Sequence, residues 1–206
     1  MRVLITAGPT REPIDAVRYI GNRSSGRMGA ALALAASRAG HTATLILGPV
    51  TAAMPPGVRR IDVETAAQMH DAVTHEFPSH DLLIMAAAVA DYRPKNVLLS
   101  KLAREGTLTI ECEATEDILA AAGGMKRTDQ RTVGFSLETR GNLDRSREKL
   151  RRKGLDLIVY NPTGTMNSAT IESILLWPDG RSETLPSRTK ADFADILFAR
   201  AAELFR

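Results

Sequence analysis

The stretch that most constrains the fold is the nearly continuous apolar run DLLIMAAAVADY at residues 81–92. A strand with one solvated face alternates apolar and polar side chains, because successive side chains point to opposite faces. An uninterrupted run is typical of a parallel strand that helices cover on both faces. The run therefore predicts a central parallel sheet with a helical layer on each side.

Strands and helices alternate along the first half of the chain. Apolar segments at 2–8, 41–48 and 58–64 predict strands, and periodic segments at 26–38 and 66–77 predict helices, with Gly40 ending the first helix. Because this order places helical connections between strands, we predict an α/β fold with a three-layer, Rossmann-like, mostly parallel sheet.

The second half is less regular, and its polar loop at 90–106 carries one apolar patch. A hairpin at 172–185 is predicted to turn at Pro-Asp-Gly. We expect this hairpin and the loop to form a small additional β-hairpin and flap region over the edge of the sheet. The remaining predicted elements are strands at 107–112, 132–138 and 156–161, a short helix capped by Thr115, and helices at 142–153 and 189–205.

Composition excludes several classes of protein. A length of 206 residues suits one domain spanning 1–206, and a net charge of +3 is too mild to favour nucleic-acid binding. The single cysteine, Cys112, permits no internal disulfide and suits a reducing cytoplasm, where we expect the protein to reside. No signal peptide or membrane span is expected. The four histidines lack H-E-x-x-H spacing, so no side-chain metal site is predicted.

The connection between the first strand and the first helix, residues 9–25, is unusually long. Such connections usually take about 2–6 residues, and longer ordered loops are usually functional. Ser24, Ser25 and Gly26 lie where the helix should begin, and a helix start offers free N–H groups to an anion such as phosphate. An ordinary capped helix is the alternative, but the neighbouring Asn22 and Arg23 favour a site. Without a G-x-G-x-x-G motif, no nicotinamide cofactor is indicated.

Three further features carry chemistry, each with a plainer alternative. Small residues at 86–90 followed by Asp91 leave room for a ligand, or else pack closely against a helix. Lys101 lies on a polar loop, where a lysine closes over phosphate or is simply solvated. A basic helix places two lysines four residues apart, where an anion would offset their repulsion, although most charged faces are solvated. Its cations are Arg140, Arg145, Arg147, Lys149, Arg151, Arg152 and Lys153.

Four segments together resemble a known family. ITAGPTREPIDAVRYIGNRSSGRMG, AAVADYRP, VGFSLET and KLRRKGLDLIVYN resemble the bacterial phosphopantothenoylcysteine synthetase domain of coenzyme A biosynthesis. The resemblance implies a ligase that activates 4′-phosphopantothenate with CTP, releases pyrophosphate, and passes the acyl group from an acyl-cytidylate to L-cysteine, releasing CMP. It also implies Mg²⁺ held mainly by the nucleotide phosphates, a homodimer, and a possible separate decarboxylase as partner.

The resemblance also assigns residues. It implies that Asn22 holds the reacting carbonyl and that Lys101 lies on a flap that closes over the intermediate. Phosphopantothenate would contact Asn22, Ala87, Ala88 and Asp91, and no side chain would bind the metal. The implied nucleotide contacts are Gly8, Ser24, Ser25, Gly26, Met85, Ala86, Ala87, Asp91, Lys101, Glu116, Asp117, Ile118, Leu119, Phe135, Lys149 and Lys153.

The chain departs from the family pattern at two places. The flap, usually Lys-x-Lys-Lys, reads KLAR at 101–104, and the nucleotide loop, usually Asn-Pro-Asp-Ile, reads TEDI at 115–118. These changes leave open CTP against ATP and motivate an alternative, a non-catalytic nucleotide-binding homologue with a regulatory or assembly role. A Rossmann reductase is disfavoured by the missing glycine motif. The decarboxylase domain that often precedes this domain is absent, so the chain is expected to be either monofunctional or an excised domain.

Overall fold

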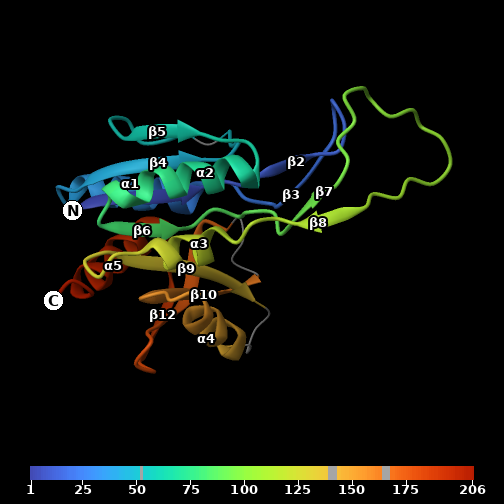
Figure 1. Cartoon of the computed structure of the whole chain (residues 1–206). Coiled ribbons are helices and arrows are strands. Elements are labelled where there is room, and N and C mark those ends of the chain that lie inside the picture. The colour runs from blue at the N-terminus through green and yellow to red at the C-terminus, as the bar shows by residue number, and fades with distance from the viewer. Residues whose placement is uncertain (52, 139–142, 164–167) are drawn as a thin grey trace.

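The computed structural model describes residues 1–206 except 52, 139–142 and 164–167. Its centre is an eight-stranded sheet in the order β12-β11-β10-β9-β6-β1-β4-β5 (Figure 1). The strands from β10 to β5 in that order are parallel, and β11 and β12 continue the sheet in antiparallel pairing. The predicted mostly parallel α/β fold is confirmed. The parallel strands are β1 (Arg2–Ala7), β4 (Thr42–Leu47), β5 (Arg59–Asp62), β6 (Leu82–Met85), β9 (Arg131–Glu138) and β10 (Leu157–Pro162).

Helices cover both faces of the sheet. On one face α1 (Arg27–Arg38) packs beside α5 (Lys190–Glu203), and the other face carries α2 (Ala66–Glu76), α3 (Ile118–Met125) and α4 (Leu143–Arg152). Strand β1 shows why the chain is apolar without interruption: Val3 lies in the core under α1 and α5, and Leu4 in the core under α2 and α3. Both side chains are fully buried. Burial of each stabilises the folded protein by about 1.5–3 kcal/mol relative to an exposed side chain.

The apolar run at 81–92 is a strand only in its first half. β6 ends at Met85, and the chain then runs alongside the segment that follows β1, where Ala88 forms an isolated parallel bridge with Pro9. Ala88 N donates to Gly8 O at 2.8 Å, and Thr10 N donates to Ala88 O at 3.3 Å. The small side chains of residues 86–88 allow this close approach. The expected strand through residue 92 is therefore wrong beyond Met85.

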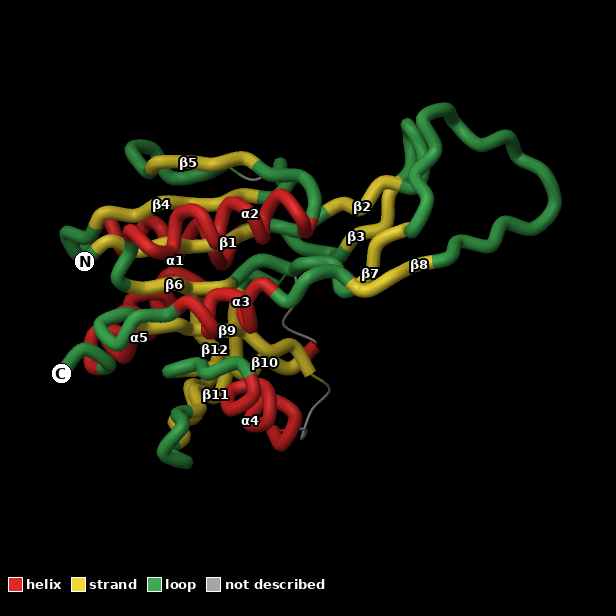
Figure 2. Tube along the Cα trace, viewed as in Figure 1, coloured by secondary structure: helices red, strands yellow, loops and turns green. Residues whose placement is uncertain are grey.

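Two short two-stranded sheets lie outside the main one. β2 (Arg11–Pro13) pairs with β3 (Tyr19–Gly21), so the predicted loop at 9–25 contains a hairpin. β7 (Tyr92–Pro94) pairs with β8 (Cys112–Ala114), and the intervening chain projects from the body as a long loop (Figure 2). We call residues 11–21 and 92–114 the arm. The strand predicted at 107–112 is wrong apart from Cys112, because its pairing with β7 begins only there.

The C-terminal hairpin belongs to the main sheet. β11 (Thr170–Leu176) and β12 (Ser182–Thr189) extend it beyond β10, and Gly180 N donates to Trp177 O at 3.2 Å in the predicted turn. The hairpin is thus confirmed, but its expected place in a lobe with the polar loop is wrong.

Two helix starts differ from the predicted caps. α1 is capped by Gly26, not by serine: Gly26 has φ 72°, and Ser24 Oγ only accepts its N–H at 3.4 Å. α3 is capped by Asp117, whose carboxylate accepts Ala120 N at 3.1 Å, and not by Thr115 as predicted. Thr115 instead donates its hydroxyl to Ala90 O at 2.6 Å. The predicted start of α4, residue 142, and Arg140 lie outside the described residues.

Candidate active site

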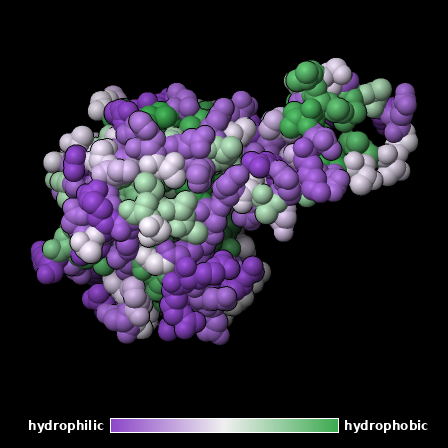
Figure 3. All heavy atoms as spheres, in the orientation of Figure 1, coloured by the Kyte–Doolittle hydropathy of each residue, from purple (hydrophilic) through white to green (hydrophobic). Residues whose placement is uncertain are grey.

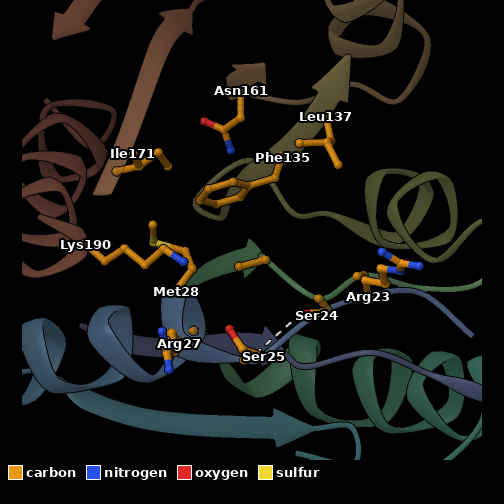
Figure 4. Close-up of a pocket in the computed structure, with 15 residues that line it drawn as sticks. Arg23, Ser24, Ser25, Arg27, Met28, Phe135, Leu137, Asn161, Ile171 and Lys190 are labelled. Atoms are coloured by element: carbon orange, nitrogen blue, oxygen red, sulfur yellow. Dashed lines mark hydrogen bonds between the residues drawn. The ribbon is translucent and has the colours of Figure 1, made fainter. Parts of the chain in front are cut away.

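Two adjoining cavities lie at the carboxyl edge of the parallel strands, where α/β sheets usually bind ligands. They share Ala87, Ala88, Phe135 and Leu137 as a common wall. We call them the helix pocket and the lysine pocket. The helix pocket is lined by residues 23–29, 86–88, Phe135, Leu137, Asn161, Ile171 and Lys190 (Figure 4). The lysine pocket is lined by Asn22, Met85, residues 87–89, Asp91, residues 115–119, Phe135, Leu137, Lys149, Arg152 and Lys153.

The helix pocket opens onto the first turn of α1. Gly26 caps α1 without a side-chain hydrogen bond, so the first N–H groups of the helix stay available, together with the positive end of its dipole. Gly29 brings α1 against β1, because a Cβ atom there would lie 2.2 Å from the Ala7 Cβ. Gly8 lies directly beneath Gly26, whose added Cβ would be 3.6 Å from the Gly8 Cα. The predicted anion site at 24–26 therefore has suitable geometry.

Asn161 and Lys190 also line the helix pocket, although neither was among the predicted site residues. Asn161 is the penultimate residue of β10 and is 8% exposed, and its Oδ1 has no hydrogen-bond partner within the described part of the chain. Lys190 is the first residue of α5; burial lowers its pKa, and the charge of Arg27 lowers it further. Only the order of the strands brings both to the start of α1. Asn161 is the last residue of the strand predicted at 156–161, and this position was the one available signal for it.

The lysine pocket gathers most of the residues assigned to the nucleotide. Lys149 Nζ donates to Phe135 O at 2.8 Å, and Lys153 Nζ donates to Asp117 Oδ1 at 2.8 Å. Burial lowers the pKa of Lys149 to about 8, and the neighbouring Lys153 adds to this effect. Arg152 lines the same cavity, although it had not been separated from the other cations of the basic helix. The pocket is therefore strongly cationic on its α4 side.

Asn22 lies where the long connection after β1 meets the residues that follow β6. Its Nδ2 donates to Val89 O at 2.8 Å and to Ala88 O at 3.3 Å. Asp91 lines the same cavity. Glu116, which departs from the family pattern, adds a negative charge to this pocket. Arg93 partly balances that charge, because Arg93 Nη1 donates to the Glu116 carboxylate at 3.3 Å. The structure thus brings the assigned substrate and nucleotide residues to one edge, with Gly8 just beneath it.

Lys101 is the exception. It is exposed on the arm and is not among the residues that line either pocket. Its neighbour Leu102 is held in place, since Leu102 N donates to Asp15 Oδ2 at 3.1 Å and Arg18 Nη2 donates to Leu102 O at 3.0 Å. We call this arrangement the Asp15–Arg18 clamp. The sequence analysis missed it, because the partners are 87 and 84 residues apart.

The carboxylate of the clamp is well suited to its role. Asp15 also accepts the N–H groups of Val17 and Arg18, both at 2.8 Å. Burial alone would raise its pKa, but these N–H groups, Leu102 N and the Arg18 charge together hold the pKa below the usual value. Asp15 therefore stays ionised and orders the hairpin turn and the flap together.

The described residues contain neither a cluster of metal ligands nor a helix that could span a membrane. Within the described residues, no group of three or more His, Cys, Asp or Glu side chains is arranged to hold a metal ion. Magnesium held by nucleotide phosphates therefore stays a prediction. None of the described helices is both long enough and apolar enough to cross a membrane.

Comparison with known proteins gives consistent matches along the chain. Residues 1–204 match the family described as DNA/pantothenate metabolism flavoprotein C-terminal domain. The coenzyme A biosynthesis bifunctional protein CoaBC of Vibrio cholerae is 45% identical over 203 residues, which cover 95% of this chain and 51% of that protein. The chain therefore spans about half the length of the curated relatives that it matches.

Solved structures agree with this. The crystal structure of the C-terminal domain of a CoaBC protein has a TM-score of 0.86 and 37% identity, covering 98% of this chain and 94% of that one. A Cab2 mutant in complex with phosphopantothenate-cysteine has a TM-score of 0.79, covering 98% of this chain and 87% of that one. At 19% identity, the likeness to Cab2 concerns the fold alone.

Proposed function

The chain belongs to the family of the DNA/pantothenate metabolism flavoprotein C-terminal domain, and from this premise we propose that it is a ligase of coenzyme A biosynthesis that joins 4′-phosphopantothenate to L-cysteine. The observation that carries the proposal is the pair of pockets that meet at Ala87, Ala88 and Phe135. The helix pocket offers a helix start to the nucleotide phosphates, and the lysine pocket offers its cationic side to the nucleoside and Asn22 and Asp91 to a second substrate. A reaction between a nucleotide and a carboxylic acid needs such adjacent sites.

The proposed reaction has two steps. A carboxylate oxygen of phosphopantothenate attacks the α-phosphorus of CTP, a bond to the bridging oxygen breaks, and pyrophosphate leaves with Mg²⁺. The amine of cysteine then attacks the acyl carbon, loses a proton, and expels CMP. The enzyme contributes mainly positioning and stabilisation of developing negative charge. In this scheme Asn22 orients the acyl group, and the first turn of α1 stabilises the phosphates.

The lysine pocket supports binding of the nucleoside part. Lys149 and Lys153 approach from α4, and Asp117 with the start of α3 forms the opposite wall. Lys149 Nζ donates one hydrogen bond to Phe135 O, and Lys153 Nζ donates one to Asp117. Each ammonium carries three donors, so both lysines retain donors for a ligand. We propose CTP as the preferred nucleotide on the family resemblance.

We also propose that the protein works as a homodimer that associates through the arm. The arm exposes apolar side chains away from the body, visible as the green region of Figure 3. Leu99 is 97% exposed and Val17 is 61% exposed. Exposed apolar side chains gathered in one place usually mark an interaction surface. Closure of the Lys101 flap over the pockets would then take place beside a second copy. The exposed large apolar residues of the arm are Val17, Tyr19, Tyr92, Val97, Leu98, Leu99 and Leu108.

One assay tests the proposed activity. The protein is mixed with Mg²⁺, phosphopantothenate, cysteine and each of the four ribonucleoside triphosphates in turn, and the amide product is measured by mass spectrometry. We expect product with CTP, and we expect pyrophosphate release without cysteine only when phosphopantothenate is present. Pyrophosphate release that is equally fast without phosphopantothenate would contradict the proposal.

The second candidate is a non-catalytic homologue that binds nucleotides for regulation or assembly. The shortened charge pattern of the flap, Lys101 followed by LAR, favours this candidate. Calorimetry distinguishes the two: tight CTP binding with no amide from any triphosphate would favour the homologue. Because the curated relatives are bifunctional and about twice as long, a separate phosphopantothenoylcysteine decarboxylase is the proposed protein partner.

A further inference from the structure

Two cations begin the two helices that border the helix pocket. Arg27 is the first residue of α1, and Lys190 is the first residue of α5. A cation at the start of a helix is unfavourable, because the helix dipole places partial positive charge there. The two side chains also lie close enough for Arg27 to lower the pKa of Lys190. The described residues thus concentrate four positive contributions, two charges and two helix ends, around one cavity.

Among the described residues that line the helix pocket there is no acidic side chain, although Asp192 lies in the first turn of α5. Within the described chain neither Arg27 nor Lys190 forms an ion pair, whereas ten other arginines there do. The acid nearest in sequence, Asp192, accepts the Thr189 hydroxyl at 2.7 Å, and Asp192 does not line the pocket. Burial lowers the pKa of Lys190, so the cation also loses part of its hydration. An arrangement that costs free energy in the empty protein indicates a ligand of negative charge.

Asn161 gives an independent indication of a ligand. Its amide group points into the helix pocket between Ile171 and Phe135 (Figure 4). The side chain is more than nine-tenths buried, and its Oδ1 has no hydrogen-bond partner within the described residues. A buried amide without a partner is costly. Rotation about the last side-chain bond presents its NH₂ donors to the same cavity at little cost.

We propose that Lys190 and Arg27 form the subsite for the two terminal phosphates of the nucleotide and hold pyrophosphate as it leaves. This inference rests on the proposed function and adds residues and a step to it. Lys149 and Lys153 lie in the adjoining pocket, beyond Phe135, so a nucleotide bound there extends its phosphate tail toward α1 and α5.

The chemistry of the subsite is electrostatic. When the α-phosphorus bond breaks, the electron pair goes to the bridging oxygen, and pyrophosphate gains the negative charge that the carboxylate loses. Lys190 and Arg27 donate hydrogen bonds to that anion and transfer no proton. They therefore stabilise the leaving group in the first step and have no contact with cysteine in the second.

Isothermal titration calorimetry of the whole protein with Mg²⁺ tests the subsite, using pyrophosphate and CMP as separate probes. We compare Lys190→Ala with Lys190→Arg, which keeps the charge, and with Arg181→Ala, which removes one charge at the distant β11–β12 turn. Thermal melting establishes that each variant is folded. We expect Lys190→Ala to weaken pyrophosphate binding by about 10- to 100-fold, the loss of one hydrogen bond to a charged group. CMP affinity should stay within about twofold, and Lys190→Arg should restore most of the binding.

The outcomes separate this inference from the proposed function. Pyrophosphate binding that depends on Lys190, in a protein that makes no amide, supports the subsite and contradicts the ligase. Unchanged pyrophosphate affinity in folded Lys190→Ala, or no pyrophosphate binding by the unaltered protein at millimolar concentration, overturns the subsite even if amide is formed. Equal losses for pyrophosphate and CMP also overturn it, because they indicate general damage to the site.

Discussion

The edge of the main sheet and the arm contrast in how they are built. The pocket walls stand on β1, β6, β9 and β10, which include fully buried side chains such as Val3 and Leu4 from two cores. The arm has little core of its own and is held by short strand pairs and the Asp15–Arg18 clamp. The candidate binding groups thus lie on the main sheet and its helices, whereas Lys101 lies on the arm, outside that framework. We therefore expect the two pockets to be formed before a ligand binds and the Lys101 flap to close only afterwards.

The largest expected effect tests whether the body alone carries the stability. Phe193 of α5 is fully buried, whereas Leu99 of the arm is 97% exposed. We expect Phe193→Ala to lower the free energy of unfolding by about 3–5 kcal/mol. Leu99→Ala should change it by less than about 0.5 kcal/mol. Urea unfolding at low protein concentration measures both, and comparable losses in the two variants would remove the contrast.

The next effect separates binding from closure. Asn22 joins the connection after β1 to the residues after β6 through its hydrogen bonds to Ala88 and Val89. We expect Asn22→Ala to reduce turnover by about 10²- to 10³-fold, the usual effect of removing a side chain that holds reacting charge. Nucleotide affinity should change little. Steady-state kinetics with CTP titration measures both, and a variant that loses only CTP affinity would contradict this role.

A smaller effect is expected from the clamp. Asp15→Asn keeps the size of the side chain but removes the charge that binds Leu102 N and Arg18. We expect turnover to fall by about tenfold because closure of the flap is less well ordered, while CTP affinity is unchanged. Limited proteolysis should cut the loop at 95–111 faster than in the unaltered protein. Asp179→Asn, at the exposed β11–β12 turn, is the matched control. Unchanged proteolysis would show that the clamp does not order the flap.

The smallest effect concerns pH and the lysine pocket. The pKa of Lys149 is lowered from 10.5 to about 8, so between these values the unfolded chain binds more protons than the native protein. Stability of the nucleotide-free protein should therefore rise with pH across this window, relative to Lys149→Met. Nucleotide binding should respond in the opposite direction and weaken above about pH 8, as the ammonium loses its proton. Melting curves and CTP titrations at several pH values measure the two trends, and parallel trends would contradict the assignment.

Sequence patterns predicted the body better than its site. Periodicity located β1, α1 and the final hairpin, because each is determined by local alternation and turn residues. Periodicity predicted β6 to run past Met85, because small residues such as Ala88 occur both in strands and in connecting segments that lie close to a neighbouring backbone. The family resemblance assigned roles to Asn22 and Lys149, and both line the lysine pocket.

Neither kind of reasoning found Lys190, Asn161 or the clamp. Lys190 and Asn161 belong to the site only because β10, β11 and β12 follow β9 in the sheet. The clamp depends on contacts between Asp15 and Leu102, which are distant in sequence. Such contacts are consequences of topology, which a local pattern does not contain.

The clamp has a further consequence for regulation. Asp15 and Leu102 connect the hairpin turn that exposes Val17 with the loop that carries Lys101 and exposes Leu99. If two copies associate through these apolar side chains, subunit association and ordering of the flap are thermodynamically coupled. Ordering of the flap then raises the association constant of the dimer, and dimerisation raises the equilibrium constant for flap ordering by the same factor. Specific activity would then fall on dilution at saturating substrate, and ligands that order the flap would tighten the dimer.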